Sequence, residues 1–168
     1  MNFERIQASE FKGNPFSLIG NDWFLLSAGS KNDFNTMTAG WGYMGVLWNR
    51  PSAVVLLRPS RHTFGYMEKE DYFTISFYDE KYREQLKLCG TKSGRDIDKV
   101  AVTGFTPAFA ECGAPYFEEA KLVLVCKKRF ERDMTPEDIP EGDKNRFFPD
   151  DDYHRIYFSE IIEVLERR

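Results

Sequence analysis

The feature that most constrains the fold is a series of short runs rich in β-branched and aromatic residues, separated by turn-forming residues. Runs of this length suit strands, and several of them in succession are typical of a β-barrel. We therefore predict a mainly β fold, a barrel that is closed or nearly closed, with a few short helices in the connections. The predicted strands are Trp23–Ala28, Ala53–Leu57, Tyr72–Tyr78, Lys121–Phe130 and Arg155–Leu165.

Helix signals are few and lie between these strands. Each has a side chain that can accept a hydrogen bond from the free N–H groups of a first helical turn. The last of them falls within residues 132–152, a charged segment with prolines that we expect to form a surface excursion. The predicted helices are Arg61–Lys69 with Ser60 as N-cap, Glu80–Leu88 between an Asp79 N-cap and Gly90 as terminator, and the single turn Thr135–Asp138.

Length and composition limit the classes of function. A chain of 168 residues predicts one domain, residues 1–168, and a net charge of −4 gives no reason to expect nucleic acid or an anionic membrane as a partner. No apolar run approaches the ~20 residues that span a bilayer. The N-terminus carries charges where a signal peptide is apolar, so we expect a cytoplasmic protein. Three scattered cysteines without a CxxC, and two distant histidines, predict reduced thiols and give no support for a zinc or other metal site.

The segment NTMTAGWGYMGVLWNRP, residues 35–51, combines small polar residues, glycines and large aromatic rings. A flat heteroaromatic ligand with a polar edge needs such a mixture, because exposed backbone groups meet its edge and a ring covers its face. The alternative is a strand with a bulge, packed by its tryptophans. The segment alone does not choose between them.

A possible anion site follows the predicted strand that ends at Leu57. The helix expected there has N–H groups without internal partners at its start, and phosphate binds such positions. Five residues with donors crowd the same place, namely Arg58, Ser60, Arg61, His62 and Thr63. The alternative is a capped surface helix with solvated arginines.

A second phosphate-capable loop is CGTKSGRDIDK, residues 89–99, in which glycine and serine alternate with the cations Lys92, Arg95 and Lys99. The alternative here is a helix terminus followed by a polar connector. Neither a GxGxxG nor a GxxxxGK[ST] motif is present. A slot for a flat ring and two phosphate-capable loops together indicate a mononucleotide with a flat ring.

Taken in order, four stretches resemble the flavin reductase-like family, in particular its flavoredoxin branch. They are NTMTAGWGYMGVLWNRP, LLRPSRHTFGYMEKEDYFTISF, LCGTKSGRDIDKVAVTGFTP and DYHRIYFSEIIEV. The resemblance implies an FMN-binding split β-barrel and a homodimer. It also implies cofactor contacts by position: Asn35, Thr36, Met37, Thr38 and Trp41 at the ring and ribityl chain, Arg58, Ser60, Arg61, His62 and Thr63 at the phosphate, and Ser93, Gly94, Arg95 and Lys99 from the second loop.

The resemblance implies that electrons pass through the flavin, so no protein nucleophile or base is required. We expect an NAD(P)H-dependent flavin reductase, with NADH or NADPH as donor. The alternative is a flavoredoxin-like electron carrier without its own nicotinamide site, and a haem or pyridoxal-type ligand is a third possibility. His154 in DYHRIY resembles a histidine near the nicotinamide, or is a strand-edge histidine paired with an aspartate. Cys89, at a helix C-terminus, is expected to have a packing role.

Overall fold

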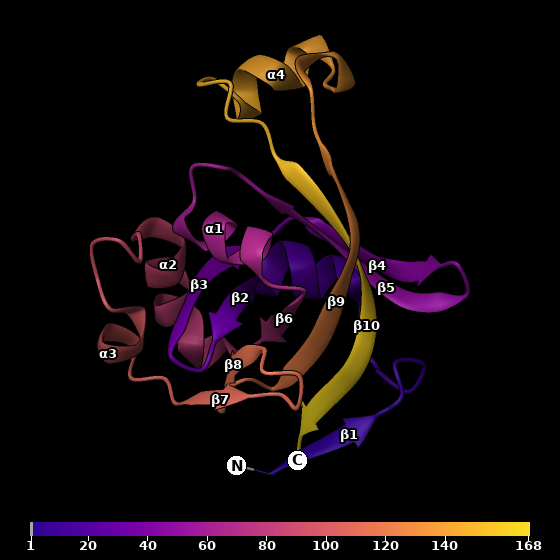
Figure 1. Cartoon of the computed structure of the whole chain (residues 1–168), viewed down its shortest axis with the longest axis vertical. Coiled ribbons are helices and arrows are strands. Elements are labelled where there is room, and N and C mark those ends of the chain that lie inside the picture. The colour runs from indigo at the N-terminus through magenta and orange to yellow at the C-terminus, as the bar shows by residue number, and fades with distance from the viewer. Residues whose placement is uncertain (1) are drawn as a thin grey trace.

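The computed structural model describes residues 2–168 and consists mainly of antiparallel strands (Figure 1). Eight strands form one sheet in the order β3-β2-β6-β9-β10-β5-β4, with β1 paired to β10, and β7 and β8 form a separate hairpin. The strands are β1 Phe3–Ile6, β2 Phe24–Ser30, β3 Asp33–Ala39, β4 Gly42–Leu47, β5 Arg50–Leu57, β6 Tyr72–Phe77, β7 Pro107–Phe109, β8 Pro115–Phe117, β9 Leu122–Asp133 and β10 Arg155–Arg167.

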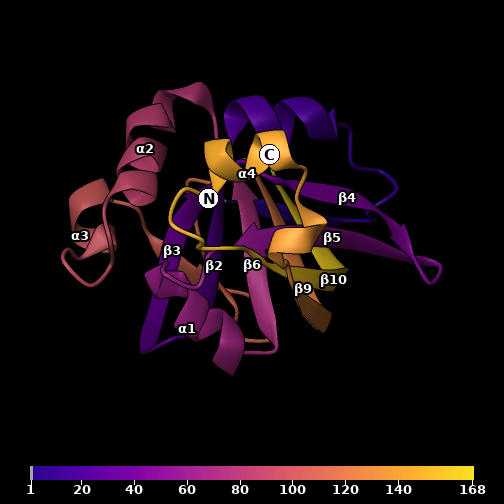
Figure 2. The same ribbon diagram turned by 90° about the horizontal axis from the view of Figure 1, so that it is seen from above.

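The helices are short and occupy the connections, as the sequence predicts. In Figure 2, α2 and α3 lie together on one side of the strands, and α1 lies over β2 and β3. The helical segments are the π-helix η1 Ser17–Asp22, α1 His62–Lys69, the 3-10 turn η2 Glu80–Tyr82, α2 Arg83–Thr91, α3 Lys99–Thr103, the 3-10 turn η3 Pro136–Asp138 and α4 Glu141–Phe147.

The barrel is split because its two end strands do not pair with each other. β3 and β4 stand at opposite ends of the sheet order, although only Gly40 and Trp41 separate them in the chain. The outer edge of β3 therefore carries backbone groups that no neighbouring strand satisfies. This edge is where the candidate site lies.

Strands at the centre of the sheet are buried on both faces, which explains their continuous apolar sequences. In β9, Leu122 and Leu124 join the cluster inside the barrel. Val123 and Val125 alternate with them on the other face of β9 and join a second cluster, under α2 and the β7–β8 hairpin. The five predicted strands are confirmed, each with bounds that differ by no more than three residues at either end.

Two predicted helix ends are wrong. Ser60 is not the N-cap of α1; Arg61 holds that position, with extended backbone and no capping side-chain bond. Gly90 does not end α2, which continues to Thr91. Gly90 lies inside the helix, where an added Cβ would lie 3.2 Å from the Cβ of Thr38 on β3, a tight contact that glycine avoids. Close packing of α2 on β3 thus accounts for a glycine that resembles a terminator.

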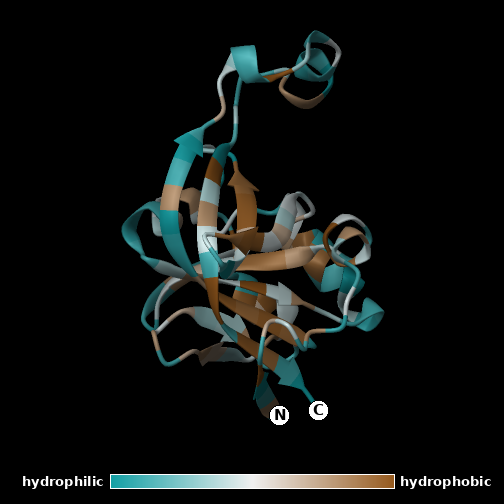
Figure 3. Ribbon diagram, turned by 90° about the vertical axis from the view of Figure 1, so that its right-hand side faces the viewer, coloured by the Kyte–Doolittle hydropathy of each residue, from teal (hydrophilic) through white to brown (hydrophobic). Residues whose placement is uncertain are grey.

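The predicted excursion is an arm that stands off the barrel at the top of Figure 1. We call residues 133–152 the arm; it contains η3, with the predicted capping box of Thr135 and Asp138, and α4, which was not predicted. Figure 3 shows that the arm is largely hydrophilic. Over residues 2–168, no helix has both the length and the apolar character needed to cross a membrane.

The β4–β5 hairpin projects from the barrel on the right of Figure 1 and ends in Trp48 and Asn49. Both residues have positive φ, 52° and 59°, which is the conformation of a tight two-residue hairpin turn. Asparagine accepts this conformation readily, whereas tryptophan rarely does. The turn therefore places a large ring, 64% exposed, at the tip of the hairpin.

Candidate functional site

Three neighbouring cavities follow the free edge of β3. The split cavity, of about 210 Å³, lies at the opening between β3 and β4; the middle cavity, of about 210 Å³, lies between α1 and the loop after α2; the outer cavity, of about 480 Å³, lies toward α3. The split and middle cavities share Met37 and Arg61, and the middle and outer cavities share Asn35, His62, Gly94, Arg95 and Lys99. All fourteen residues predicted as cofactor contacts line at least one of the three.

The hydroxyls of β3 are used within the protein. Ser27 Oγ donates to Thr36 Oγ1 over 2.8 Å, and Thr36 Oγ1 also lies 3.3 Å from the carbonyl oxygen of Leu26. Thr38 Oγ1 donates to the carbonyl oxygen of Leu86 over 2.5 Å. These side chains therefore fix β3 to its neighbours and have little capacity left for a ligand.

The backbone of β3 is better placed for a ligand than its hydroxyls. The carbonyl oxygen of Thr36 accepts a bond from Lys99 Nζ, so the polar groups of Thr36 point away from the paired strand β2. Backbone direction repeats every two residues along a strand, and Thr38 therefore presents its N–H and C=O on the same free edge. This edge enters the split cavity, as expected for a slot that binds the polar rim of a flat ring.

Trp41 and His154 line the split cavity, and both lie beside the arm. The Trp41 ring is 5.3 Å from the rings of both His154 and Phe147. Arg58 ties the arm down, donating to the carbonyl oxygens of Phe147 (2.6 Å) and Asp152 (3.1 Å). Its guanidinium lines the split cavity and not the middle cavity, so it lies farther from the proposed phosphate position than the sequence suggested.

His154 is buried and neutral. Burial, and then the nearby cation of Arg58, lower the pKa of its imidazole to about 4, against a smaller opposite effect of Asp152. Within the described chain its buried Nδ1 has no hydrogen-bond partner, so the alternative of a histidine paired with an aspartate is not found at this nitrogen. His154 lines the split cavity as a neutral ring.

The middle cavity is strongly cationic. Among the described residues that line it are Arg61, Lys92, Arg95 and Lys99, and no carboxylate. Arg61 is half-buried at the start of α1, where its Nη2 donates to the carbonyl oxygen of Gly90 over 2.9 Å. Burial, followed by the neighbouring Arg58, lowers its pKa. An anion would relieve this accumulation of positive charge at the positive end of a helix.

Lys99 is a buried cation with a donor to spare. Its Nζ donates to the carbonyl oxygens of Thr36 (2.7 Å) and Cys89 (2.8 Å), which leaves the third of its three donors free. Burial lowers its pKa to about 8, so the ammonium remains mainly charged at neutral pH. Cys89 itself is fully buried, and burial raises the pKa of its thiol to about 11, which agrees with a packing role.

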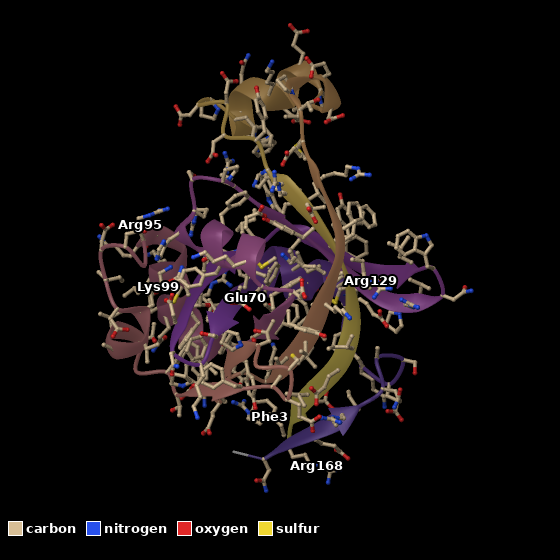
Figure 4. All side chains as sticks on the ribbon, in the orientation of Figure 1. Phe3, Glu70, Arg95, Lys99, Arg129 and Arg168 are labelled. Carbon is tan, nitrogen blue, oxygen red and sulfur yellow. The ribbon has the colours of Figure 1, made fainter. Side chains whose placement is uncertain are left out.

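The loop after α2 closes on α1 through Gly94. A Cβ at this position would lie 2.2 Å from Asn35 Oδ1 and 3.1 Å from His62 Cδ2, so only glycine allows this approach. Arg95 Nη1 then donates to the carbonyl oxygen of Ser60 over 3.2 Å. Figure 4 labels Arg95 and Lys99 on the same side of the molecule, beside α2 and α3.

Two hydrogen bonds near the start of α1 affect how an anion could bind in the middle cavity. Asn35 Nδ2 donates to Thr63 Oγ1 over 2.8 Å, which fixes the first turn of α1 against β3. Ser60 Oγ, which the sequence predicted as a helix cap, donates instead to a carboxylate oxygen of Asp152 on the arm, over 2.5 Å. Asp152 therefore competes for a hydroxyl that a phosphate in the middle cavity would also use.

Sequence analysis predicted the arm as a surface excursion but not its contacts with the site, and it missed the outer cavity. Phe147 and Asp152 reach the site only because β9 and β10 carry the arm toward Arg58, a contact with no local signal. The additional lining of the outer cavity comes mostly from Asp33, Phe34, Tyr66 and residues 96–98. Within residues 2–168, no group of three or more His, Cys, Asp or Glu side chains is arranged to hold a metal ion.

Comparison with known proteins agrees with this architecture. A search of curated proteins finds no match. Among solved structures, a flavoredoxin from Methanosarcina acetivorans is 22% identical, with a TM-score of 0.70 over 96% of this chain and 77% of that chain. An FMN-binding domain of a flavin reductases-like enzyme from Shewanella baltica is 19% identical, with a TM-score of 0.70 over 98% and 77%. Flavoredoxin of Desulfovibrio vulgaris (Miyazaki F) is 24% identical, with a TM-score of 0.68 over 87% and 69%.

At these identities the solved structures establish the fold, a split β-barrel. The family model of the flavin reductase like domain matches residues 16–167, which is almost the whole chain. The chain belongs to the flavin reductase-like domain family.

Proposed function

We propose that this protein binds FMN and uses it to pass electrons from NADH or NADPH to an acceptor. The observation that carries the proposal is the order of the cavities along β3: a slot walled by Trp41 and His154, followed by a middle cavity lined by four cations and no carboxylate. A flat ring with a phosphate at the end of a flexible chain matches this order. Solved relatives described as flavoredoxin and FMN-binding proteins support the same reading.

The residues present fit this cofactor. The free edge of β3 would meet the polar rim of the ring through the backbone groups of Thr38, which lines the split cavity. Arg61, Arg95 and Lys99 would hold the phosphate, with the hydroxyl of Ser60. Bound FMN would supply hydride and electron transfer, and the protein would contribute orientation and positive potential.

His154 has a positioning role in this proposal. Its neutral imidazole lines the split cavity, where a ring nitrogen could accept a hydrogen bond but carries no charge. A nicotinamide carboxamide is a donor of the required kind. Substitution of His154 by Phe should therefore lower the rate of flavin reduction by NAD(P)H and leave the dissociation constant of FMN nearly unchanged.

The arm supports a second candidate function, that of an electron carrier with a protein partner. Between Asp133 and Asp152 there are eight Asp or Glu residues and two Lys or Arg residues, on a segment that stands off the barrel (Figure 3). A projecting acidic element suits a basic partner surface. Such a carrier would not need a nicotinamide site of its own.

Anaerobic reduction distinguishes the two functions. The FMN-loaded protein is mixed with NADH or NADPH, and the flavin absorbance is followed by stopped flow. Rapid bleaching by either nucleotide is expected of a reductase. Bleaching no faster than that of free FMN, together with normal reduction by dithionite, would favour the carrier.

We also propose a homodimer. Phe16 (88% exposed), Tyr43 and Trp48 leave large apolar groups in solvent near the β4–β5 hairpin, and one cavity is lined by both Phe16 and Tyr43. A second copy would bury this surface. Light scattering at micromolar concentration should give twice the monomer mass of 19.6 kDa, and Tyr43→Glu should shift it toward the monomer.

A further inference from the structure

A surface of aromatic and cationic side chains lies on the outer side of the barrel. Its residues come from the β4–β5 hairpin, β9 and β10, and none of them lines the split, middle or outer cavity. Figure 4 labels one of them, Arg129, on the side of the molecule where the hairpin projects. We call this surface the cationic face, and it consists of Trp48, Arg50, Lys127, Arg129, Phe130 and Phe158.

Three rings form the centre of the cationic face. Phe130 and Phe158 are opposite each other in the ladder of β9 and β10, and their rings stack at a centroid distance of 4.3 Å. The Trp48 ring lies 5.6 Å from Phe130 and is 64% exposed. Trp48 has the positive φ described above, a conformation that costs energy for a bulky residue and is found most often where a surface binds something.

The charge around these rings is only partly balanced. Arg50 Nη1 and Arg129 Nη1 both pair with one carboxylate, that of Glu160, at 3.3 and 3.5 Å. Lys127 adds a third cation, opposite Glu160 in the ladder. Aromatic residues together with arginine are enriched at the centre of protein interfaces. The cationic face therefore suits an acidic protein surface.

The arm has the complementary charge. It contains eight acidic and two basic residues, a net charge of −6. Glu141 and Asp143, in the first turn of α4, are exposed, and neither side chain has a hydrogen bond or ion pair within residues 2–168. The arm extends beyond the ends of β9 and β10, away from the cationic face of its own chain (Figures 1 and 4).

We propose that a second copy of this chain places its arm on the cationic face, and that its own cationic face receives the arm of the first copy. Both features lie on the ribbon of β9 and β10, so a two-fold axis midway between them creates two equivalent contacts.

This inference rests on the proposed homodimer and gives it a specific contact. The exposed Tyr43 is continuous with the cationic face, because Tyr43, Val54 and Phe158 are neighbours across β4, β5 and β10. Each arm also packs beside its own split cavity, where the Phe147 ring lies 5.3 Å from Trp41, so the partner would hold it in place. An arm held in this way would not be free for the basic partner of an electron carrier.

Paired charge reversals test the contact. Analytical ultracentrifugation of the full chain over a range of concentrations gives the dissociation constant of the dimer. The face variant Arg50→Glu/Arg129→Glu and the arm variant Glu141→Lys/Asp143→Lys should each raise it at least tenfold, because like charges would meet at both contacts. An equimolar mixture of the two variants should form a heterodimer within threefold of the wild-type affinity, because each face then meets an arm of opposite charge.

Lys31→Glu/Lys87→Glu is the matched control. It reverses two exposed cations, on the β2–β3 turn and α2, and should leave the dissociation constant within twofold. Arg50→Gln/Arg129→Gln replaces the face variant if added carboxylates beside Glu160 prevent folding. It should raise the dissociation constant at least threefold and reduce its dependence on salt.

The possible failures are distinguishable. Reversal variants that dimerise as tightly as the wild type, or a mixture that stays as weak as its components, overturn the proposal and leave a homodimer through Phe16 and Tyr43. A wild-type chain that is monomeric at micromolar concentration overturns both. FMN titrations are separate, so a chain that dimerises as described and binds no FMN would keep this contact and lose the proposed flavin function.

Discussion

Replacement of Arg61 by alanine tests the phosphate assignment directly. The guanidinium lines both the split and the middle cavities and makes one hydrogen bond, to the carbonyl oxygen of Gly90. Burial and the proximity of Arg58 disfavour its charge, as its lowered pKa shows. A negative group in the middle cavity would offset both the burial of this charge and its repulsion by Arg58.

The expected sizes follow from these contacts. A hydrogen bond between charged groups contributes about 1.5–3 kcal/mol, so Arg61→Ala should weaken FMN by about 10- to 150-fold. Riboflavin lacks the phosphate and should lose less than about twofold. In the flavin-free protein, loss of the bond to Gly90 is partly offset by relief of desolvation and repulsion. The free energy of unfolding should therefore change by no more than about 1 kcal/mol.

Calorimetric titration of both flavins and urea unfolding of the flavin-free protein measure these three quantities. Arg132→Ala is the control, because it removes one exposed arginine from β9 and leaves all three cavities intact. If Arg61→Ala weakens riboflavin as much as FMN, or weakens neither, the phosphate does not bind beside Arg61. The middle cavity would then need another occupant.

Three further outcomes are expected from the same site. Gly94→Ala should destabilise the protein by about 1–3 kcal/mol and weaken FMN binding, because the added Cβ would meet Asn35. Gly142→Ala is the control, since open space surrounds Gly142, and it should change neither the thermal melt nor the FMN titration. Asp152→Asn should strengthen FMN binding by roughly 1 kcal/mol, since it removes a competing charge near the phosphate. Asp150→Asn is its control. Weaker FMN binding by Asp152→Asn in calorimetry would show that Asp152 instead orients Ser60. The pKa of Lys99, lowered from 10.5 to about 8, means that only the unfolded chain binds this proton between those pH values. The free energy of unfolding should rise with pH in that window while FMN binding weakens by up to about tenfold per pH unit, and Lys99→Met should abolish both trends.

Much of the barrel could be predicted because its central strands are buried on both faces and therefore have continuous apolar sequences. The first half of β9, with Leu122 to Cys126 all buried, is an example. β10 is less buried and was predicted from its β-branched and aromatic residues, and the bounds of both strands were nearly correct. For β3 the sequence left a ligand slot and a bulged strand open, because its small polar residues weaken the strand signal. The structure shows why they are tolerated: the hydroxyls of Thr36 and Thr38 are satisfied by backbone groups or a serine from neighbouring elements, so a polar strand can be buried.

The structure brings together the residues predicted as cofactor contacts, which come from separate parts of the chain. The two phosphate-capable loops are local signals, and the structure brings both to the middle cavity. Residues from distant elements could not be found in this way. Asp152 and Ser60, which are hydrogen-bonded, lie 92 positions apart in the sequence. Gly90 resembles a helix terminator in the sequence, and only the fold places it against Thr38.

The topology itself explains why one strand organises the whole site. β3 ends the sheet order, so one of its edges is free, and the two-residue link to β4 holds Trp41 at the opening of the barrel. Seven residues of strand extend over roughly 20 Å, the distance from one side of the site to the other. Each cavity takes at least two consecutive or alternate residues of β3 for its wall. Ring and phosphate positions would therefore be set by the direction of a single strand, and a ligand reversed along it would place its phosphate against Trp41 and its ring among cations.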